Sequence, residues 1–327
     1  MPALPPFGWG SFVHHWDLRL GWIVVGVLLL GGYLDAVVRG RQRGAKHPGW
    51  RVACFVAGVL VLVLTVSSAI DVYAMSLFWV HMVEHLLLIM VVPVLLVLGH
   101  PLSAVRGALG DRGQARFDKV VRTGPIALIT HPAVGLALYA GVIIGTHLTG
   151  FMDQMVTHSW LMTGEQVAYV VAGYLVVLPL LGREPVRWDV PYLPRFVLVL
   201  VAMVPDTVVG IVLLQSSKVS FPLMFSLHPA WAPDAVSDQQ IAGGLMWAVG
   251  DGLMMMIGIG VVIMMIADPQ RKRVLGNWLE SARSNTLDDH LVSSGGAVRA
   301  DSGADVDDDE STLDAYNAML ARLSDQG

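Results

Sequence analysis

Seven apolar segments constrain the fold of this chain more than any other feature. Most of them reach the roughly 20 residues that an α-helix needs to cross the hydrocarbon core of a bilayer. In lipid, a spanning segment must satisfy its backbone hydrogen bonds internally, which favours helices at this length. The sequence therefore predicts an all-α, polytopic membrane bundle of seven transmembrane helices. We place them at residues 20–38, 52–70, 77–98, 126–148, 166–181, 196–214 and 241–267.

The composition agrees with a membrane protein. Charged residues make up 14% of the chain, against about 25% in soluble domains. The single cysteine, Cys54, excludes an intramolecular disulfide and a cysteine-based metal cage. Residues 1–17 lack the basic start of a signal peptide, so we expect no cleavage and retention of the first segment as a span.

Lysine and arginine residues alternate between the two ends of the predicted spans. One side carries only Arg19 before the first span and Lys218 between the sixth and the seventh. The other side carries Arg39, Arg41, Arg43, Lys46, Arg51, Arg106, Arg112, Arg116, Lys119, Arg122, Arg183, Arg187, Arg195, Arg271, Lys272 and Arg273. Because basic connections tend to stay in the cytoplasm, we predict an outside N-terminus and a cytoplasmic C-terminus.

This topology divides the chain into an extracytoplasmic segment at 1–19, a membrane domain at 20–267 and an acidic cytoplasmic tail at 268–327. Residues 293–310 are rich in Gly, Ser, Ala and Asp, a composition typical of disorder. Apolar residues at helical spacing then predict a short amphipathic helix near 312–323. Such a helix would dock on a cytoplasmic partner or on the membrane surface, or it would remain an unpartnered tail helix.

Two histidines and a glutamate open the third apolar segment. His81, Glu84 and His85 have the spacing i, i+3 and i+4, which places their side chains on one helical face. Ionisable groups at membrane depth are costly and mark candidate functional sites. A bound metal is the simplest reason to gather them there, and the predicted orientation places this metal site at the outer end of the span.

Further candidate ligands follow in the next two segments. His147 ends the fourth segment, and His158, Met162 and Glu165 lead into the fifth. Other soft or acidic groups near the predicted outer face are Met75, Met82, Met152, Met155, Asp71 and Asp153. Imidazole and thioether ligands without cysteine favour copper, with thioether sulfur favouring Cu(I). The alternative is structural, because methionines commonly fill apolar space and an interfacial histidine is often a hydrogen-bonded anchor.

Two other metal chemistries fit parts of the pattern. His81-x-x-Glu84-His85 matches the H-x-x-E-H pattern of a zinc protease, in which Glu84 would act as the base. No third zinc ligand is evident downstream in the sequence. A haem held by His81 and either His147 or His158 is the other alternative, but it would leave His85 unexplained.

Two acids lie near the middle of predicted spans. Asp206 follows Pro205 in the sixth segment, and Asp251 lies in the seventh, before the run Met254–Met256. These acids would form an ion path through the bundle, which would make the protein a copper transporter. Alternatively, they would be neutral acids that stabilise helix packing.

The third segment also carries a resemblance to a known family. Residues 81–99, HMVEHLLLIMVVPVLLVLG, resemble the H-M-x-x-H…P-x-L-L-x-L-G signature of the CtaG-type cytochrome c oxidase assembly factors. The region His147…His158…Glu165 is similar to a second signature of that family. Residues 238–247, DQQIAGGLMW, are similar to the D-Q-x-x-A-G-x-x-M-W entry to its last span. The resemblance covers roughly residues 15–270.

The resemblance implies a non-enzymatic role in the assembly of haem-copper oxidases, in a bacterial cell membrane. The protein would bind copper, mainly as Cu(I), and deliver it to the oxidase subunit that houses the copper centre. Its partners would be that subunit and the lipid bilayer, and not nucleic acid. The matching histidines are His81, His85, His147 and His158. Where the family often has two further histidines, this chain has Met162 and Gln166, so we expect a softer Cu(I) site.

Overall fold

The computed structural model describes residues 4–8, 10, 14–181, 183–268, 283, 285 and 310–325, and the regular structure within these residues is helical. The helices are α2 (Leu20–Gln42), α3 (Gly49–Thr65), α4 (Ala69–Ala74), α5 (Phe78–Leu86), the π-helical turn η1 (Leu87–Val91), α6 (Val92–Leu98), α7 (Pro101–Ala108), α8 (Asp111–Val121), α9 (Gly124–Ile129), α10 (Pro132–His147), α11 (Phe151–Thr157), α12 (Ser159–Leu181), α13 (Tyr192–Gln215), α14 (Pro222–Phe225), α15 (Ala235–Ala267) and α17 (Glu310–Asp325). The predicted all-α fold is confirmed.

Each of the seven predicted segments lies in helical structure, but not every segment is one long helix. Five stretches are long and apolar enough to cross a membrane: α2, the stretch Phe78–Ala108, α12, α13 and α15. A sixth would be the pair α10 and α11, which is bent by 69°. The remaining apolar helix, α3, has 17 residues. The count of seven spans and the orientation of the chain therefore stay predictions.

The fourth predicted segment, 126–148, divides into two helices. It begins inside α9, which ends at Ile129, and continues in α10, which begins at Pro132. Proline lacks a backbone N–H and suits the first turn of a helix. The preceding residue, His131, is extended, and its ring accepts a hydrogen bond from Ala133 N as the N-cap. This break is therefore built into the local sequence.

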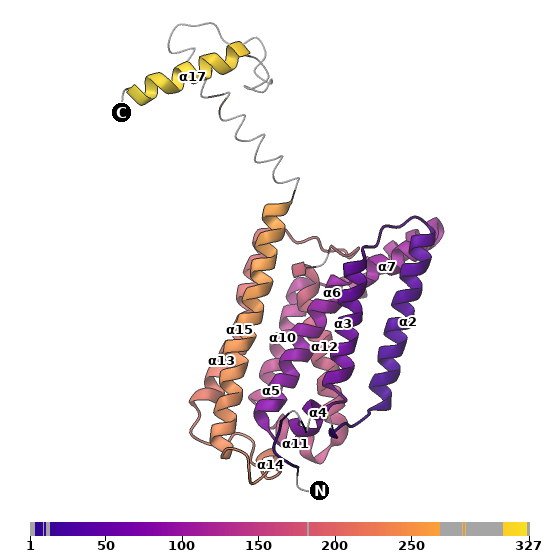
Figure 1. Cartoon of the computed structure of the whole chain (residues 1–327), viewed down its shortest axis with the longest axis vertical. Helices are drawn as coiled ribbons and strands as arrows, with labels where there is room; N and C mark the ends of the chain where they lie inside the picture. Colours follow the sequence, from indigo (N-terminus) through magenta and orange to yellow (C-terminus); the bar gives the residue numbers. More distant parts are fainter. Residues whose placement is uncertain are drawn as a thin grey trace. The chain divides into compact units, whose positions relative to one another are not determined.

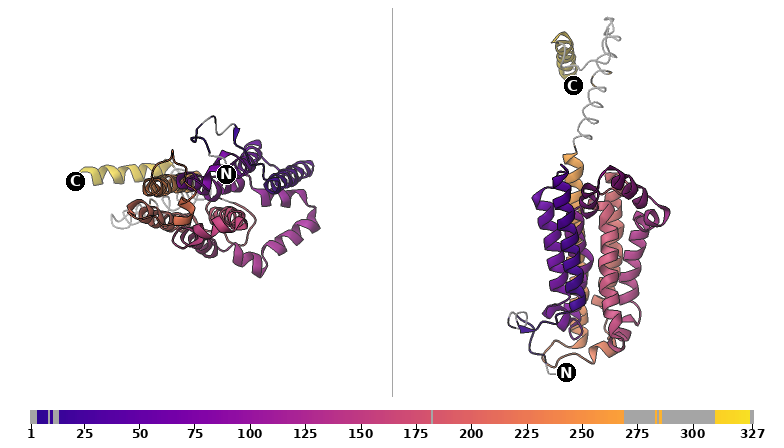
Figure 2. Two further views of the ribbon diagram at one scale, coloured as in Figure 1. Left: turned by 90° about the horizontal axis from the view of Figure 1, so that it is seen from below. Right: turned by 90° about the vertical axis from the view of Figure 1, so that its right-hand side faces the viewer.

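The chain folds into two units, 1–261 and 262–327. In the first unit, α12 packs against α10, α6 and η1. Figure 1 shows these helices side by side, with α4, α11 and α14 at the end of the bundle where the chain begins and α7 at the other end. The side view in Figure 2 shows the long helices of this unit running along a common direction.

The third predicted segment changes helical form directly after the metal-ligand candidates. α5 carries His81, Glu84 and His85, and η1 follows it before α6 begins at Val92. A proline ring clashes with the carbonyl four residues earlier, and for Pro93 that carbonyl belongs to Ile89, in the middle of η1. π-helical turns of this kind occur often at functional sites. Pro93 thus supplies a local reason for the π-turn.

Gly173 allows α12 to approach this turn. A Cβ atom at position 173 would overlap the Ile89 carbonyl and would lie 2.7 Å from Pro93 Cγ. Only glycine leaves enough space for this contact between backbones, as small residues do at other membrane helix interfaces. The contact matters for the candidate site, because it fixes α12 against the segment that carries both histidines.

The second unit contains α17, whose range covers the amphipathic helix predicted near 312–323. In this helix Met319 is buried and Leu320 is exposed. The predicted disordered stretch lies, over residues 293–309, outside the residues that the structure describes.

Replacement of Gly173 by alanine tests the α12–η1 contact. We expect Gly173→Ala to lower the free energy of unfolding by about 1–3 kcal/mol, the usual cost of forcing an extra group into a packed interior. The measurement is thermal or denaturant unfolding of the purified protein in detergent. The control is Gly164→Ala in the same helix, where an added Cβ meets nothing within 4 Å. Equal stability of the two variants would contradict the close contact.

Candidate metal centre

The predicted helical face on α5 is present and is buried in the bundle. The exposed fractions of His81, Glu84 and His85 are 1%, 1% and 5%. The rings of His81 and His85 lie close together, with centroids 4.1 Å apart. The spacing of the three residues in the sequence is therefore sufficient to place both imidazoles at one buried point.

A carboxylate from α12 completes a three-residue group. Glu165 Oε2 lies 3.6 Å from His81 Nε2, and Glu165 Oε1 lies 3.4 Å from His85 Nε2. One donor atom from each residue lies within 4.8 Å of the other two, and within the described residues this is the group of histidine and acidic side chains that could hold a metal ion. The candidate site thus joins two segments that are about 80 residues apart in the sequence.

His147, the last residue of α10, lies beside this group. Its ring centroid is 5.1 Å from that of His85. Its Nδ1 lies 3.0 Å from the Ile143 carbonyl oxygen. If Nδ1 carries the proton and donates it to that carbonyl, Nε2 keeps a free lone pair, which is the state in which imidazole binds metals. His147 Nε2 is buried and has no hydrogen-bond partner, and it lies next to the three-residue group without belonging to it.

The donor atoms of this cluster fit a metal ion better than they fit one another. In this cluster, the buried side-chain atoms without a hydrogen-bond partner include His81 Nδ1, His81 Nε2, His85 Nδ1, His147 Nε2 and Glu165 Oε1. Burying polar atoms without partners costs free energy. The N···O separations of 3.4 and 3.6 Å are close to the distance of about 3.3 Å between ligands in a tetrahedral site with bonds of about 2.0 Å.

Glu84 faces a hydrogen-bonded network rather than the three-residue group. Gln166 Nε2 donates to Glu84 Oε1 at 2.6 Å and to Asp71 Oδ1 at 2.8 Å. Gln166 Oε1 accepts a hydrogen bond from Trp22 Nε1. Gln166 stands where the resembling family often has a histidine, and in the structure its side chain binds Glu84 and Asp71.

Arg19 extends this network from Asp71 to Met162. Its Nη2 lies 2.8 Å from Asp71 Oδ2 and also donates to the Met162 sulfur at 3.4 Å. Burial raises the pKa of Asp71 to about 6, and the charge of Arg19 opposes that shift. Met162, which the sequence suggests as a soft ligand, is therefore already in contact with a cation.

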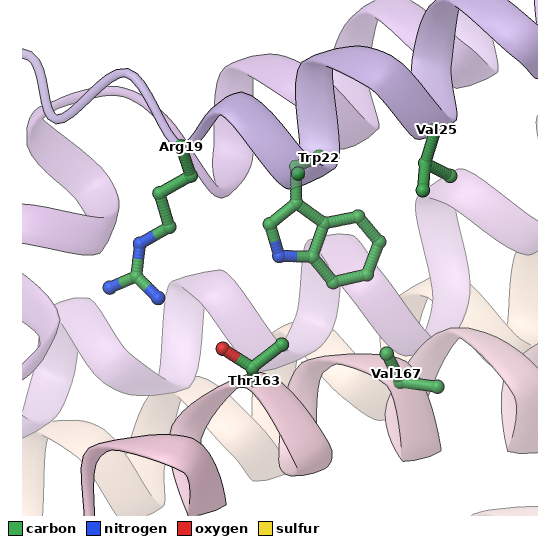
Figure 3. A pocket seen from close by; sticks show the side chains of 6 residues that line it. Arg19, Trp22, Val25, Thr163 and Val167 are labelled. Atoms are coloured by element: carbon green, nitrogen blue, oxygen red, sulfur yellow. The ribbon is translucent and has the colours of Figure 1, made fainter.

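A cavity lies next to Arg19. It has a volume of about 380 Å³ and is lined by Arg19, Gly21, Trp22, Val25, Thr163 and Val167. Figure 3 shows the side chains of Arg19, Trp22 and Val25 facing those of Thr163 and Val167 across it. The cavity thus separates the beginning of α2 from the beginning of α12, close to Met162.

Tyr169 supports the histidines and was not singled out from the sequence. Its ring stacks on that of His85 with centroids 4.0 Å apart, and its hydroxyl lies 2.8 Å from Thr146 Oγ1 and 3.3 Å from His147 Nδ1. The residue lies four positions after Glu165 and seven after Met162, on the same face of α12. That spacing is the signal in the sequence that could have identified it.

Two other groups of predicted site residues lie outside this cluster. His158 is exposed, and its Nδ1 lies 2.8 Å from Thr157 Oγ1. Asp206 accepts a hydrogen bond from the Tyr139 hydroxyl, and Asp251 accepts one from Thr207 at 2.8 Å. These bonds join α13 to α10 and to α15, as expected for acids that stabilise helix packing. An ion path through Asp206 and Asp251 stays a hypothesis.

The donor set alone does not select the metal. Two histidines and one carboxylate bind zinc in hydrolases and iron in oxygenases, and imidazole also suits copper. The sequence showed no evident third ligand for a zinc site, whereas the structure brings Glu165 into that position. The identity of the metal must therefore be inferred from the family of the protein as well as from the geometry of the site.

The chain resembles mycobacterial proteins of unassigned function. It is 29% identical over 310 residues to an uncharacterized protein of Mycobacterium leprae. The aligned region covers 92% of this chain and 43% of that protein. It is 27% identical over 332 residues to uncharacterized proteins of Mycobacterium bovis and Mycobacterium tuberculosis, which covers 99% of this chain and 46% of each. The chain thus spans less than half the length of these relatives.

No solved structure matches the chain. A family model shows the broader relationship. The model described as cytochrome c oxidase caa3 assembly factor (Caa3_CtaG) matches residues 31–268. The match extends from α2 to the end of α15 and includes the whole buried cluster. The chain therefore belongs to the family of caa3-type cytochrome c oxidase assembly factors.

Proposed function

We propose that this protein binds copper at the cluster of His81, His85 and Glu165, with His147 as a fourth donor, and supplies it to cytochrome c oxidase. The observation that carries the proposal is the set of buried donor atoms that have no partner within the described part of the chain. Membership of the oxidase assembly family makes copper the relevant cargo, because haem-copper oxidases require it. Imidazole ligands suit this metal.

Copper would be cargo rather than a resident cofactor. Its ligands must be deprotonated to bind, so His81 and His85 act as neutral imidazoles. Release needs ligand exchange with a recipient site, and no bond in a substrate is made or broken. Buried histidines suit this task, because they shield the ion from other ligands until a recipient approaches.

The protein loads and releases the ion at the outer end of the bundle in this proposal. α4, α11 and α14 lie at the end of the bundle where the chain begins (Figure 1), which is the outer end if the predicted orientation holds. Asp153 of α11 accepts hydrogen bonds from Leu223 N and Met224 N of α14, at 3.0 and 3.1 Å. Since the histidines are buried, exchange of the ion requires these outer elements to move. Met162 would become a ligand only after Arg19 releases its sulfur.

A zinc-dependent hydrolase is the second candidate, and Glu165 is the observation that favours it. His81, His85 and Glu165 form the donor set of hydrolytic zinc sites. In that function Glu84 would be the general base. Its Oε1 atom is held by Gln166 at 2.6 Å, and a water molecule would have to reach a residue that is 1% exposed. These features favour cargo binding over hydrolysis.

The metal content of the purified protein tests the proposed site directly. We expect copper in the wild type and its loss in the double variant His81→Ala/His85→Ala, because two of the donors are removed. The measurement is elemental analysis after exposure to copper and zinc together. The control is His158→Ala, which changes an exposed histidine and should keep the copper. Zinc in place of copper in the wild-type protein would contradict the proposal that the site binds copper.

Two Glu→Gln variants, which keep the size of the side chain and remove its charge, separate the roles of Glu84 and Glu165. Glu165→Gln should weaken copper binding by at least ~10- to 100-fold, since even outer-shell changes cost this much at metal sites. Glu84→Gln should bind copper within a few-fold of the wild type. A competition titration with a chelator measures both affinities. The opposite order would assign Glu84, and not Glu165, to the metal.

Oxidase assembly in cells tests the function of the bound metal. A strain without this protein should assemble little active oxidase at low copper. Wild-type protein and His158→Ala should restore the activity, whereas His81→Ala/His85→Ala should not. Excess copper in the medium should raise oxidase activity in the deficient strain, because mass action replaces delivery. Full activity with the double-histidine variant at low copper would contradict the proposal.

A further inference from the structure

The helix that carries the histidines is capped by a residue from the last long helix. The first backbone N–H groups of a helix have no partner within the helix, and Leu77 supplies no side-chain cap to α5. Asp238 of α15 fills this place, because its Oδ2 accepts a hydrogen bond from Phe78 N at 2.8 Å and its Oδ1 accepts one from Trp79 N at 3.0 Å. Asp238 is fully buried.

α5 is a short segment that depends on contacts at its two ends. It has nine residues, and its C-terminal end enters the π-turn η1, where the regular helical pattern stops. Its N-terminal end is held by the two hydrogen bonds to Asp238. His81 lies one turn after Phe78, so a change in the height or rotation of the first turn moves its imidazole directly.

Phe78 connects the cap to the histidines by a second contact. Its ring lies nearly parallel to that of His81, at an interplanar angle of 14° and a centroid distance of 6.1 Å. Its centroid is also 6.4 Å from that of His147. The residue whose amide binds Asp238 thus packs between two of the candidate donors, and a shift of its backbone would disturb both.

His228 binds the same carboxylate from the outer side. Its Nε2 lies 3.1 Å from Asp238 Oδ2, the oxygen that also accepts from Phe78 N. His228 lies between α14 and α15. Asp238 therefore joins the outer connection, the last long helix and the first turn of α5.

We infer that Asp238 is a positioning residue for the metal centre: it fixes the height and rotation of α5 so that His81 and His85 meet Glu165. The inference rests on the proposed binding of copper by this cluster. Metal donors must be held within about 0.5 Å of their productive geometry, and a carboxylate that binds two consecutive amides provides this precision. Asp238 itself does not contact the metal.

The same fold offers a matched cap that is remote from the histidines. Glu184 accepts hydrogen bonds from Leu102 N at 3.3 Å and from Ser103 N at 2.8 Å, at the start of α7. It is also buried, with an exposed fraction of 8%. Asp238 thus caps the start of α5 and Glu184 caps the start of α7, both within the stretch Phe78–Ala108, and of the two only Asp238 adjoins His81 and His85.

The test compares Asp238→Asn with Glu184→Gln. Each variant keeps the size of the side chain and replaces one acceptor oxygen by an amide group, so one backbone N–H loses its partner. We expect similar losses of thermal stability. We expect a ~10- to 100-fold weaker copper affinity only in Asp238→Asn. The copper X-ray absorption spectrum should change in that variant and remain as in the wild type in Glu184→Gln.

The outcomes separate this inference from the proposed function. Wild-type protein that binds no copper would overturn both. Copper binding in the wild type, with the same affinity and spectrum in Asp238→Asn, would overturn the positioning role alone. Equal losses of affinity in Asp238→Asn and Glu184→Gln would also overturn it, because the effect would then be one of general stability.

A second variant keeps the test decisive if Asp238→Asn fails to fold. Asp238→Glu retains the charge and both oxygens but moves them by one methylene group. We expect it to fold, to bind copper more weakly than the wild type and to show an altered copper spectrum. Wild-type affinity and spectrum in Asp238→Glu would overturn the positioning role.

Discussion

A polar group buried in an apolar bundle must find a partner, because neither lipid nor packed side chains can replace water. Most buried acids of this protein obey that constraint. Asp71 pairs with Arg19, Asp206 with the Tyr139 hydroxyl, and Asp238 with two backbone amides. Each of these pairs also joins helices that are distant in the sequence. The hydrogen bonds that satisfy buried polar groups therefore hold the bundle in one arrangement.

The histidine cluster concentrates the unpartnered polar atoms of the described residues in one place. Of the eleven unpartnered buried side-chain atoms in the described residues, five belong to the cluster of His81, His85, His147 and Glu165. The other six atoms are spread over six residues, which are His15, Arg19, Arg51, Ser67, Glu84 and Asp251. Those of the cluster, by contrast, lie close together. A cation satisfies such a set, whereas an added protein donor would satisfy only one of its members.

The sequence predicted the local part of this site better than its distant part. The spacing of His81, Glu84 and His85 is a property of one helix, so the shared face followed from the sequence alone. Gln166 and Tyr169 act through contacts with other helices, and the spacing on α12 shows only that they share a face. The family resemblance singled out residues 238–247 as a pattern, but the hydrogen bonds of Asp238 become visible only when α5 and α15 lie together.

The positions of the helix breaks were likewise only partly predictable from the sequence. The apolar segments and the all-α class follow from composition and length, since helices are the structures that long apolar runs form in lipid. The π-turn at residues 87–91 depends on Pro93 and also on the approach of α12 at Gly173. Pro93 is visible in the sequence, whereas the close approach at Gly173 depends on how the two helices pack.

The division of donors between a short and a long helix bears on how an ion could leave. His81 and His85 lie on α5, a nine-residue segment that ends in a π-turn, whereas Glu165 lies on α12, which has 23 residues and packs against α10, α6 and η1. Any displacement of α5 relative to α12 separates both imidazoles from the carboxylate together. The elements that bind the N-terminal end of α5, Asp238 and the connection that carries His228, would therefore influence the donor set without contributing a donor to it.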